Sequence, residues 1–231
     1  MPKTRLYLFD IDCTLLWSQG AGRVAMGHAM LEVFGFRTGI DSHEFAGKTD
    51  WLSLVELLAP RGYGHDDIAR IMPEYDRAMG KHLARIIGDF DVQPCPGAPD
   101  VVAQLRNQED ALLALVTGNV GSSAPIKLRA AGYDPAHFAV GAYGSEAMDR
   151  DALPPLALAR AIEHHRQNIP PEQVIVIGDT PADVQCARAL GAVAVAVRTG
   201  YCKPGELEAS KADFLLDDLT QFAEVLSNLG D

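Results

Sequence analysis

Short apolar segments recur along the chain and have the length of β-strands. LYLFD at 6–10, ALLALVT at 111–117 and VIVIGD at 174–179 are apolar throughout rather than alternating. This pattern is typical of strands that are buried on both faces of a parallel sheet. Three more segments have the same character, the first of them more weakly: 137–144, 192–197 and 213–217.

Helical patterns lie between these apolar segments. Residues 124–131 end before a glycine, which favours a helix C-terminus there. Residues 181–190 begin with Pro181 at the first helical position, and 154–165 also has helical spacing. Strands that alternate with helices predict an α/β fold, a doubly wound Rossmann-like parallel sheet whose ligand binds at the carboxyl ends of the strands.

Residues 18–93 interrupt this alternation. Apolar residues recur there with near-helical spacing, most clearly over 51–59 and 68–86. We therefore expect an inserted helical cap domain at 18–93. The Rossmann-like catalytic core would then consist of 1–17 and 94–231.

Composition and charge narrow the class of protein. The chain has 231 residues, 48% of them hydrophobic and 22% charged, which excludes wholesale disorder. Its 20 Lys and Arg against 31 Asp and Glu leave a net charge of −11. Since no basic cluster accompanies this acidic balance, we expect no nucleic-acid partner. An anionic substrate would need a local source of positive charge.

Two features of the sequence favour a cytoplasmic location without a membrane partner. Asp10 and Asp12 interrupt the apolar N-terminal run, unlike a signal peptide, and no apolar stretch reaches the roughly 18 residues of a membrane span. The four cysteines are scattered and form no CxxC pair, so neither a zinc site nor a disulfide framework is indicated. We expect Cys13 to be a small buried residue rather than an oxidation-sensitive thiol.

Asp10 and Asp12 stand two residues apart, directly after the first predicted strand. In extended backbone the two side chains face the same way, about 6.5–7 Å apart along the chain. One carboxylate can attack a phosphorus atom while the other handles the proton of the leaving group. Crowded acids that face a phosphate need a cation, and Mg²⁺ prefers oxygen ligands. Alternatively, Asp10 caps a turn and Asp12 is solvated.

Asp179 and Asp183 form a second acidic group, after the strand at 174–179. Asp179 is predicted at the strand end and Asp183 in the first turn of the next helix. The pattern Thr180-x-x-Asp183 is also a helix-capping box, favoured by the helix dipole. Capping and metal binding are compatible, because a cap can orient a carboxylate that also reaches a metal.

Thr117, Gly118 and Asn119 follow another predicted strand and precede a helix. They supply a hydroxyl, a glycine that permits close approach and backbone amides, which together suit a phosphate oxygen. By itself this triplet is also compatible with an ordinary strand-to-helix turn.

These motifs occur in a characteristic order: DxDxT at 10–14, Thr-Gly-Asn at 117–119, a basic residue, and GDxxxD at 178–183. In this order the chain resembles the haloacid dehalogenase-like hydrolase superfamily, over essentially its whole length. Within it, the chain is similar to the capped phosphatases of the phosphoglycolate phosphatase-like group. The resemblance implies a Mg²⁺-dependent phosphatase that hydrolyses a small anionic phosphomonoester, such as phosphoglycolate, through an aspartyl-phosphate.

The resemblance also implies a role for each motif residue. Asp10 would be the nucleophile, and Asp12 the general acid for the leaving alcohol and then the general base for water. Dehalogenases of the superfamily lack a carboxylate at the position of Asp12, so phosphate transfer is favoured. The phosphoryl group would be bound by Thr117, Gly118 and Asn119. The metal would be held by Asp10, the Asp12 carbonyl, Asp179 and Asp183.

The third motif departs from the pattern of the group, which usually has Lys-Pro there. Arg150 is the best positional candidate for the positive charge, and Lys127 is the alternative. An arginine can neutralise a phosphoryl oxygen, although its planar fork differs from the point charge of lysine. The competing interpretation is a surface arginine paired with Asp149 or Asp151.

The predicted cap would select the substrate. In similar proteins, loops such as those carrying Arg23, Lys48 and Thr49 face the active site, where they could contact a substrate carboxylate or distal phosphate. The alternative is ordinary helix capping by Thr49 or Asp50, with both basic side chains solvated.

Three other functions remain open at this level. A sugar-phosphate mutase of the same superfamily would need a cap that excludes water. A signalling receiver domain also has an acidic Mg²⁺ site, but it needs neither the DxD pair nor the insert. A catalytically silent phosphate-binding scaffold is supported only by Arg150 in place of lysine. The sequence predicts no oligomeric state.

Overall fold

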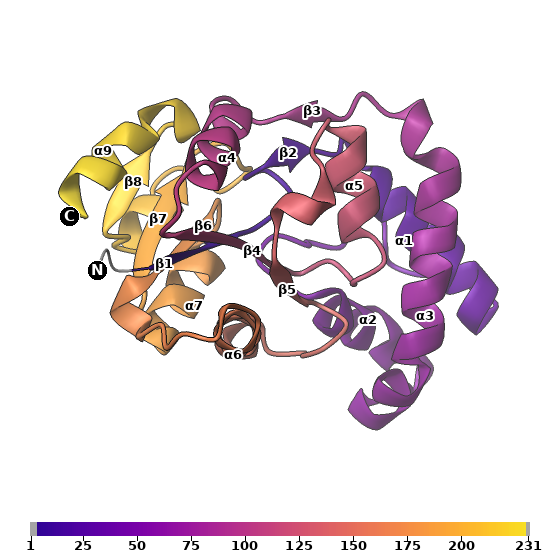
Figure 1. Ribbon diagram of the computed structural model, residues 1–231. Helices are drawn as coiled ribbons and strands as arrows, with labels where there is room; N and C mark the ends of the chain where they lie inside the picture. The colour runs from indigo at the N-terminus through magenta and orange to yellow at the C-terminus, as the bar shows by residue number, and fades with distance from the viewer. Residues whose placement is uncertain (1–3, 230–231) are drawn as a thin grey trace.

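The structure is a computed structural model that describes residues 4–229. Within this range, six parallel strands form a sheet in the order β5-β4-β1-β6-β7-β8 (Figure 1). The strands are β1 (Arg5–Phe9), β4 (Ala111–Thr117), β5 (Val140–Tyr143), β6 (Val174–Gly178), β7 (Val193–Val197) and β8 (Phe214–Leu216). Five of them lie within the segments that the apolar pattern predicts, and β1 begins one residue before its segment, so the α/β prediction is confirmed.

Strand β1 lies inside the sheet, where Leu8 pairs with Ala114 of β4 and Val176 of β6. The chain runs from β1 out to β4 and β5 and then returns to β6. The carboxyl ends of β1 and β6 therefore meet at a topological switch point, the usual ligand site of such sheets. The residues that follow Phe9 and Gly178 are placed there.

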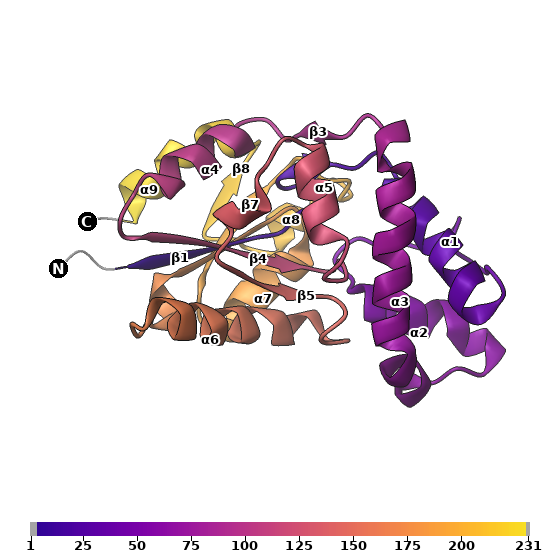
Figure 2. The same cartoon turned by 45° about the vertical axis from the view of Figure 1, so that its right-hand side comes forward.

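Helices cover both faces of the sheet (Figure 2). One layer contains α4 (Ala98–Arg106), α5 (Ala124–Ala130) and α9 (Phe222–Asn228). The opposite layer contains α6 (Leu153–His165), α7 (Pro181–Leu190) and α8 (Glu206–Ala209). Because side chains alternate along a strand, Tyr7 and Phe9 belong to the first apolar cluster and Leu6 and Leu8 to the second. Burial on both faces explains why these strands are apolar throughout.

Helix ends follow the local sequence. Gly191, with φ of 79°, ends α7 in the left-handed conformation that glycine adopts without strain. At the other end of α7, Thr180 and Asp183 form the predicted capping box. Single 3-10 turns lie at Ala59–Arg61, Ile87–Asp89, Pro135–His137, Arg150–Ala152, Pro171–Gln173 and Leu219–Gln221.

Three helices form a separate layer beyond the sheet, visible at the right of Figure 2. They are α1 (Ala21–Phe34), α2 (Asp50–Leu58) and α3 (His65–Ile86). Met26, Leu54 and Tyr75, one from each helix, belong to a third apolar cluster that is distinct from the two around the sheet. Helix α3 continues through Pro73. None of the described helices is long and apolar enough to cross a membrane.

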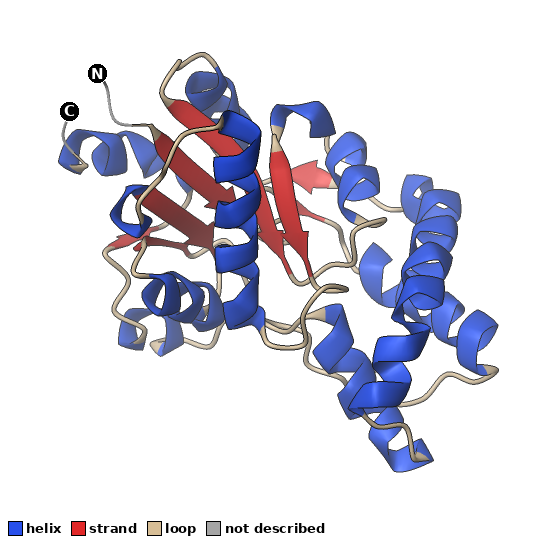
Figure 3. Cartoon of the chain, turned by 60° about the horizontal axis from the view of Figure 1, so that its bottom comes forward, coloured by secondary structure: helices blue, strands red, loops and turns tan. Residues whose placement is uncertain are grey.

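The chain passes between the two parts of the molecule through a short antiparallel ribbon. It pairs β2 (Leu16–Trp17) with β3 (Gln93–Pro94). The predicted limits of the cap, 18–93, begin and end at this ribbon, and they stay a prediction. Figure 3 shows the separation between the strand-containing part and the all-helical part.

Candidate active site

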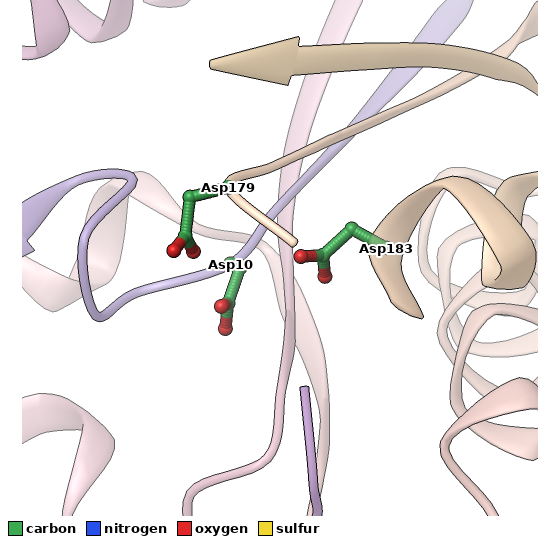
Figure 4. Close-up of side chains that lie close together, drawn as sticks. All are labelled: Asp10, Asp179 and Asp183. Carbon is green, nitrogen blue, oxygen red and sulfur yellow. The ribbon is translucent and has the colours of Figure 1, made fainter. Parts of the chain in front are cut away.

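Three carboxylates meet at the switch point of the sheet (Figure 4). Asp10 follows β1, Asp179 follows β6, and Asp183 lies in the first turn of α7. Each offers one oxygen, and these oxygens lie within 4.8 Å of one another. All three residues are buried, so their mutual repulsion is weakly screened by water.

Two glycines leave room for this cluster. A Cβ atom on Gly178 would lie 2.1 Å from the carboxyl carbon of Asp183. A Cβ atom on Gly200 would lie 1.9 Å from Oδ2 of Asp179. Both distances are far below a van der Waals contact, so any side chain at either position would displace a carboxylate.

Arg150 is the positive charge bonded to this cluster. Its Nη2 lies 2.5 Å from Oδ1 of Asp183 and 3.2 Å from Oδ2 of Asp10. The side chain is buried, which differs from the alternative of a surface arginine paired with Asp149 or Asp151. Among the described residues, Oδ1 of Asp10 and Nε of Arg150 are buried without a hydrogen-bond partner.

The cluster is short of positive charge. Burial, followed by repulsion from Asp183 and Asp12, raises the pKa of Asp10 to about 6, although Arg150 opposes the shift. Burial and then Asp183 and Asp10 raise the pKa of Asp179 well above its ordinary value. Three crowded oxygen ligands and an unpartnered carboxylate oxygen fit a hard divalent cation, which would relieve the repulsion.

Asp12 has a different environment from Asp10, two residues away. Ser18 Oγ donates to its Oδ1 at 2.6 Å, while Asn119 Nδ2 at 2.8 Å and Lys127 Nζ at 2.5 Å donate to its Oδ2. Burial alone would raise the pKa of Asp12, but these partners, Lys127 above all, hold the pKa below its ordinary value. The carboxylate is therefore ionised and held in one orientation.

Thr117 and Asn119 lie beside Asp12. Thr117 is buried at the end of β4, and Asn119 Nδ2 donates to its Oγ1 at 2.7 Å. Asn119 thus connects the threonine to Asp12. Gly118 has a further role, because a Cβ atom there would lie 2.1 Å from the backbone oxygen of Lys48. The missing side chain leaves room for the Lys48 backbone, which lies just before α2.

The structure brings both candidate cations of the third motif into the site. Arg150 contacts Asp10 and Asp183, whereas Lys127 contacts Asp12 and donates to Asn119 Oδ1 at 2.6 Å. The two positive charges thus belong to different carboxylates. The sequence offered them as alternatives because their separation of 23 positions (150 − 127) does not show that both side chains converge.

The three candidate residues of the cap lie outside these two groups. Arg23 donates to the backbone oxygens of Ile40 and His43. The Lys48 ammonium lies 2.5 Å from Oε2 of Glu56. Thr49 caps α2 by accepting from the Leu52 amide at 3.1 Å and donates to the Met148 carbonyl at 2.8 Å. Their role toward a substrate stays a prediction.

Cys13 forms the turn between Asp12 and the ribbon. Its φ of 61° is in the left-handed region, which is uncommon for a residue with a side chain. Burial raises the pKa of its thiol, which makes the thiolate scarce. This supports an inert turn residue, although it is less buried than we expected.

Several residues at the site carry no sequence signal of their own. Ser18 lies six positions beyond Asp12, and Gly200 follows β7 without a recognisable motif. Asp50 and Asp76 contact the loop after Thr117 from α2 and α3. The sequence places Asp50 at a helix start, and that local interpretation gives no indication of its contact with Val120.

Comparison with known proteins agrees with this geometry. Residues 152–222 match the family model described as HAD-hydrolase-like. Phosphoglycolate phosphatase of Synechococcus elongatus is 28% identical over 222 residues, which cover 96% of this chain and 97% of that protein. Phosphoglycolate phosphatase of Vibrio vulnificus is 26% identical over 230 residues, 96% of each chain. The crystal structure of a hydrolase from Pseudomonas syringae has the same fold, with a TM-score of 0.71, 22% identity and coverage of 99% and 100%.

The fold, the buried carboxylates and these relatives define the class of the protein as a haloacid dehalogenase-like hydrolase. Within that class it is a phosphoglycolate phosphatase-like protein, a phosphoric monoester hydrolase. The resemblance of its motifs is thereby confirmed.

Proposed function

We propose that the chain is a Mg²⁺-dependent phosphatase that hydrolyses a small anionic phosphomonoester, with phosphoglycolate as the leading substrate, through an aspartyl-phosphate on Asp10. One observation carries the proposal: Asp10 and Asp12 leave the same strand but lie in opposite charge environments. The crowded Asp10 suits a nucleophile that a cation keeps ionised, and the hydrogen-bonded Asp12 suits a group that is oriented to exchange a proton. The relatives' activity points to the same reaction.

The metal would be held by Asp10, Asp179 and Asp183 together with the Asp12 carbonyl. Mg²⁺ would neutralise charge on the phosphoryl oxygens and on the nucleophile. Thr117, Gly118 and Asn119 would bind the transferring group through a hydroxyl and backbone amides. Arg150, already bonded to Asp10, orients the nucleophile and supplies further positive charge.

Hydrolysis then proceeds in two steps, transfer of the phosphoryl group to Asp10 and its release to water. An Asp10 oxygen forms a bond to phosphorus as the bond to the leaving oxygen breaks, and Asp12 gives that oxygen a proton. Asp12 next takes a proton from water, whose oxygen attacks phosphorus and releases phosphate and free Asp10. At rest Asp12 is ionised, as the second step needs; the negative charge of an incoming phosphate favours its protonation for the first.

Lys127 would act at the leaving-group side of the site. Its ammonium has three N–H donors, and two acceptors are Asp12 and Asn119. A leaving group that contacts Asp12 therefore lies near this buried cation, which suits an anionic group such as a carboxylate. The described cysteines are free thiols, which agrees with the cytoplasm as the proposed compartment.

The test is phosphate release from a panel of phosphomonoesters that includes phosphoglycolate, with and without Mg²⁺, for the wild type and Asp10→Asn. We expect Mg²⁺-dependent release that the substitution abolishes. Release that persists in Asp10→Asn would contradict Asp10 as nucleophile. Conversion that needs a bisphosphate activator and frees little phosphate would identify a mutase. No release, with no phosphorylated Asp10, would identify a silent scaffold.

A further inference from the structure

The loop at 118–123, which follows β4 and carries Asn119, is bonded to the helical layer as well as to the core. At its start, the Asp50 amide donates to the Gly118 carbonyl at 2.7 Å. Two residues later, the Val120 amide donates to Oδ2 of Asp50 at 2.9 Å. The single residue Asp50, at the N-terminus of α2, thus holds the loop on both sides of Asn119.

Asp76, on α3, holds the far end of the same loop. Its Oδ1 accepts from the Ser122 amide at 2.9 Å, and its Oδ2 accepts from Ser145 Oγ at 3.1 Å. Ser122 Oγ donates back to the Asp76 carbonyl at 2.6 Å. Ser145 in turn accepts from the Gly121 amide at 3.3 Å. The carboxylate therefore joins two core loops to one cap helix.

The loop has little space in which to move. A Cβ atom on Gly144 would lie 1.8 Å from the Gly118 oxygen, and one on Gly80 would lie 2.7 Å from Ser122 Oγ. The Lys48 backbone is also close to Gly118, because a Cβ atom on Gly118 would lie 2.1 Å from the Lys48 oxygen. Core and cap therefore hold the loop from two sides, with glycines at the points of contact.

Asn119 lies between the residues that Asp50 bonds, and it contacts both Thr117 and Asp12. Any shift of Gly118 or Val120 would be passed to these contacts through one peptide unit. We infer that Asp50 and Asp76 are positioning residues that set, from the cap, the geometry of the phosphoryl-binding loop. The inference rests on the proposed function for the identity of that loop, and neither aspartate touches the substrate.

The consequence is that phosphate affinity depends on two side chains of the helical layer. Their substitution would weaken the binding of phosphate and slow its transfer, while Asp10, Asp179 and Asp183 would keep their metal. A misplacement of about 1 Å can reduce a rate by about 100-fold, so for a smaller shift of the loop we expect a loss of about tenfold in phosphate affinity and in kcat. If Asp50 and Asp76 only held the helical layer against the core, their substitution would lower the stability of the fold and leave phosphate affinity unaltered.

The experiment measures binding of inorganic phosphate in saturating Mg²⁺ by calorimetry, together with kcat and KM. The variants are Asp50→Ala, Asp50→Asn and Asp76→Ala. Asp67→Ala is the matched control, because Asp67 caps α3 through the Gly64 amide and pairs with Arg70, both within the cap. It should lower cap stability without changing phosphate affinity.

We expect phosphate to bind about tenfold more weakly to both alanine variants, with a similar fall in kcat. Asp50→Asn should recover most of the affinity, since its amide oxygen can still accept from Val120. Unchanged phosphate affinity in both alanine variants would overturn the inference, and so would an equal loss in Asp50→Asn and Asp50→Ala. Turnover of esters by the wild type decides the proposed function separately, because phosphate binding needs no turnover.

Discussion

The two carboxyl groups that leave β1 lie in contrasting surroundings. Asp10 shares one guanidinium with Asp183, faces Asp179, and keeps an oxygen without a partner among the described residues. Asp12 has both oxygens occupied by donors from Ser18, Asn119 and Lys127. The pKa of the first is raised to about 6, and that of the second is lowered.

This contrast explains how neighbouring aspartates can perform different chemistry. The cluster around Asp10 has excess negative charge and gains from a cation. The surroundings of Asp12 are already complete, so a metal is not needed to hold it ionised. An extended backbone points residues i and i+2 to the same side, so the proposed mechanism has both carboxylates act on one substrate.

The largest effect is expected from Asp179→Asn, which removes one acid from the crowded cluster. Activity should fall by about 10³-fold or more, because the metal loses a ligand. Without metal, the variant should be more thermostable than the wild type near neutral pH, since a buried carboxylate with a raised pKa opposes folding when ionised. Melting curves with and without Mg²⁺ check this. A variant that Mg²⁺ stabilises as much as the wild type would contradict the assignment.

Lys127→Met should disturb the surroundings of Asp12 and leave those of Asp10 intact. Asp12 would keep Ser18 and Asn119 but lose its charged partner, so we expect kcat to fall by about 100-fold. Metal affinity should stay the same, because the residue contacts none of Asp10, Asp179 and Asp183 in the described hydrogen bonds. Activity as a function of Mg²⁺ concentration separates the two quantities. A large rise in the Mg²⁺ requirement would contradict the division of roles.

Gly200→Ala should act on the metal cluster alone. The new Cβ atom would lie 1.9 Å from Asp179 Oδ2 and push that carboxylate away. We expect the Mg²⁺ requirement to rise about tenfold, with partial recovery of kcat at high Mg²⁺. Gly88→Ala is a suitable control, because a Cβ atom there meets nothing within 4 Å. Equal Mg²⁺ requirements in the two variants would argue against Asp179 as a ligand.

The smallest effect concerns the pH dependence of stability. Burial raises the pKa of Asp50 from 3.8 to about 6, with repulsion from Asp12 and Asp76 opposed by the Val120 amide and Lys127. The wild type should therefore lose stability as pH rises from about 4 to about 6, and Asp50→Asn should lack that loss. Melting temperatures should favour the variant by a few degrees more at neutral than at acid pH. A difference that is independent of pH would contradict the shift.

The sequence predicted most of the fold. Strands buried on both faces are apolar without interruption, and Gly191 and Pro181 mark the limits of α7 by local chemistry alone. The carboxylates of the site were also predictable, because Asp10, Asp12, Asp179 and Asp183 follow strands or begin a helix within short motifs. These signals are local, so they survive without knowledge of the packing.

Contacts between distant segments could not be read in this way. Asp50 and Val120 are 70 positions apart, and Asp76 and Ser122 are 46 apart. Each aspartate also has an ordinary local interpretation, as a residue at a helix start or on the polar side of a helix. Likewise, Gly118 suited a phosphate oxygen, whereas its missing side chain makes room for Lys48. Only the packing of residues from the helical layer against the core distinguishes these roles.

The most direct measurement follows p-nitrophenol release from p-nitrophenyl phosphate by Asp12→Asn. This leaving group needs no acid, so the first step should proceed while the second, which needs Asp12 as base, is slow. We predict a burst of about one nitrophenol per enzyme, with a phosphoryl group on the peptide that contains Asp10. Steady release without a burst, or a phosphoryl group on another residue, would contradict the division of roles between Asp10 and Asp12.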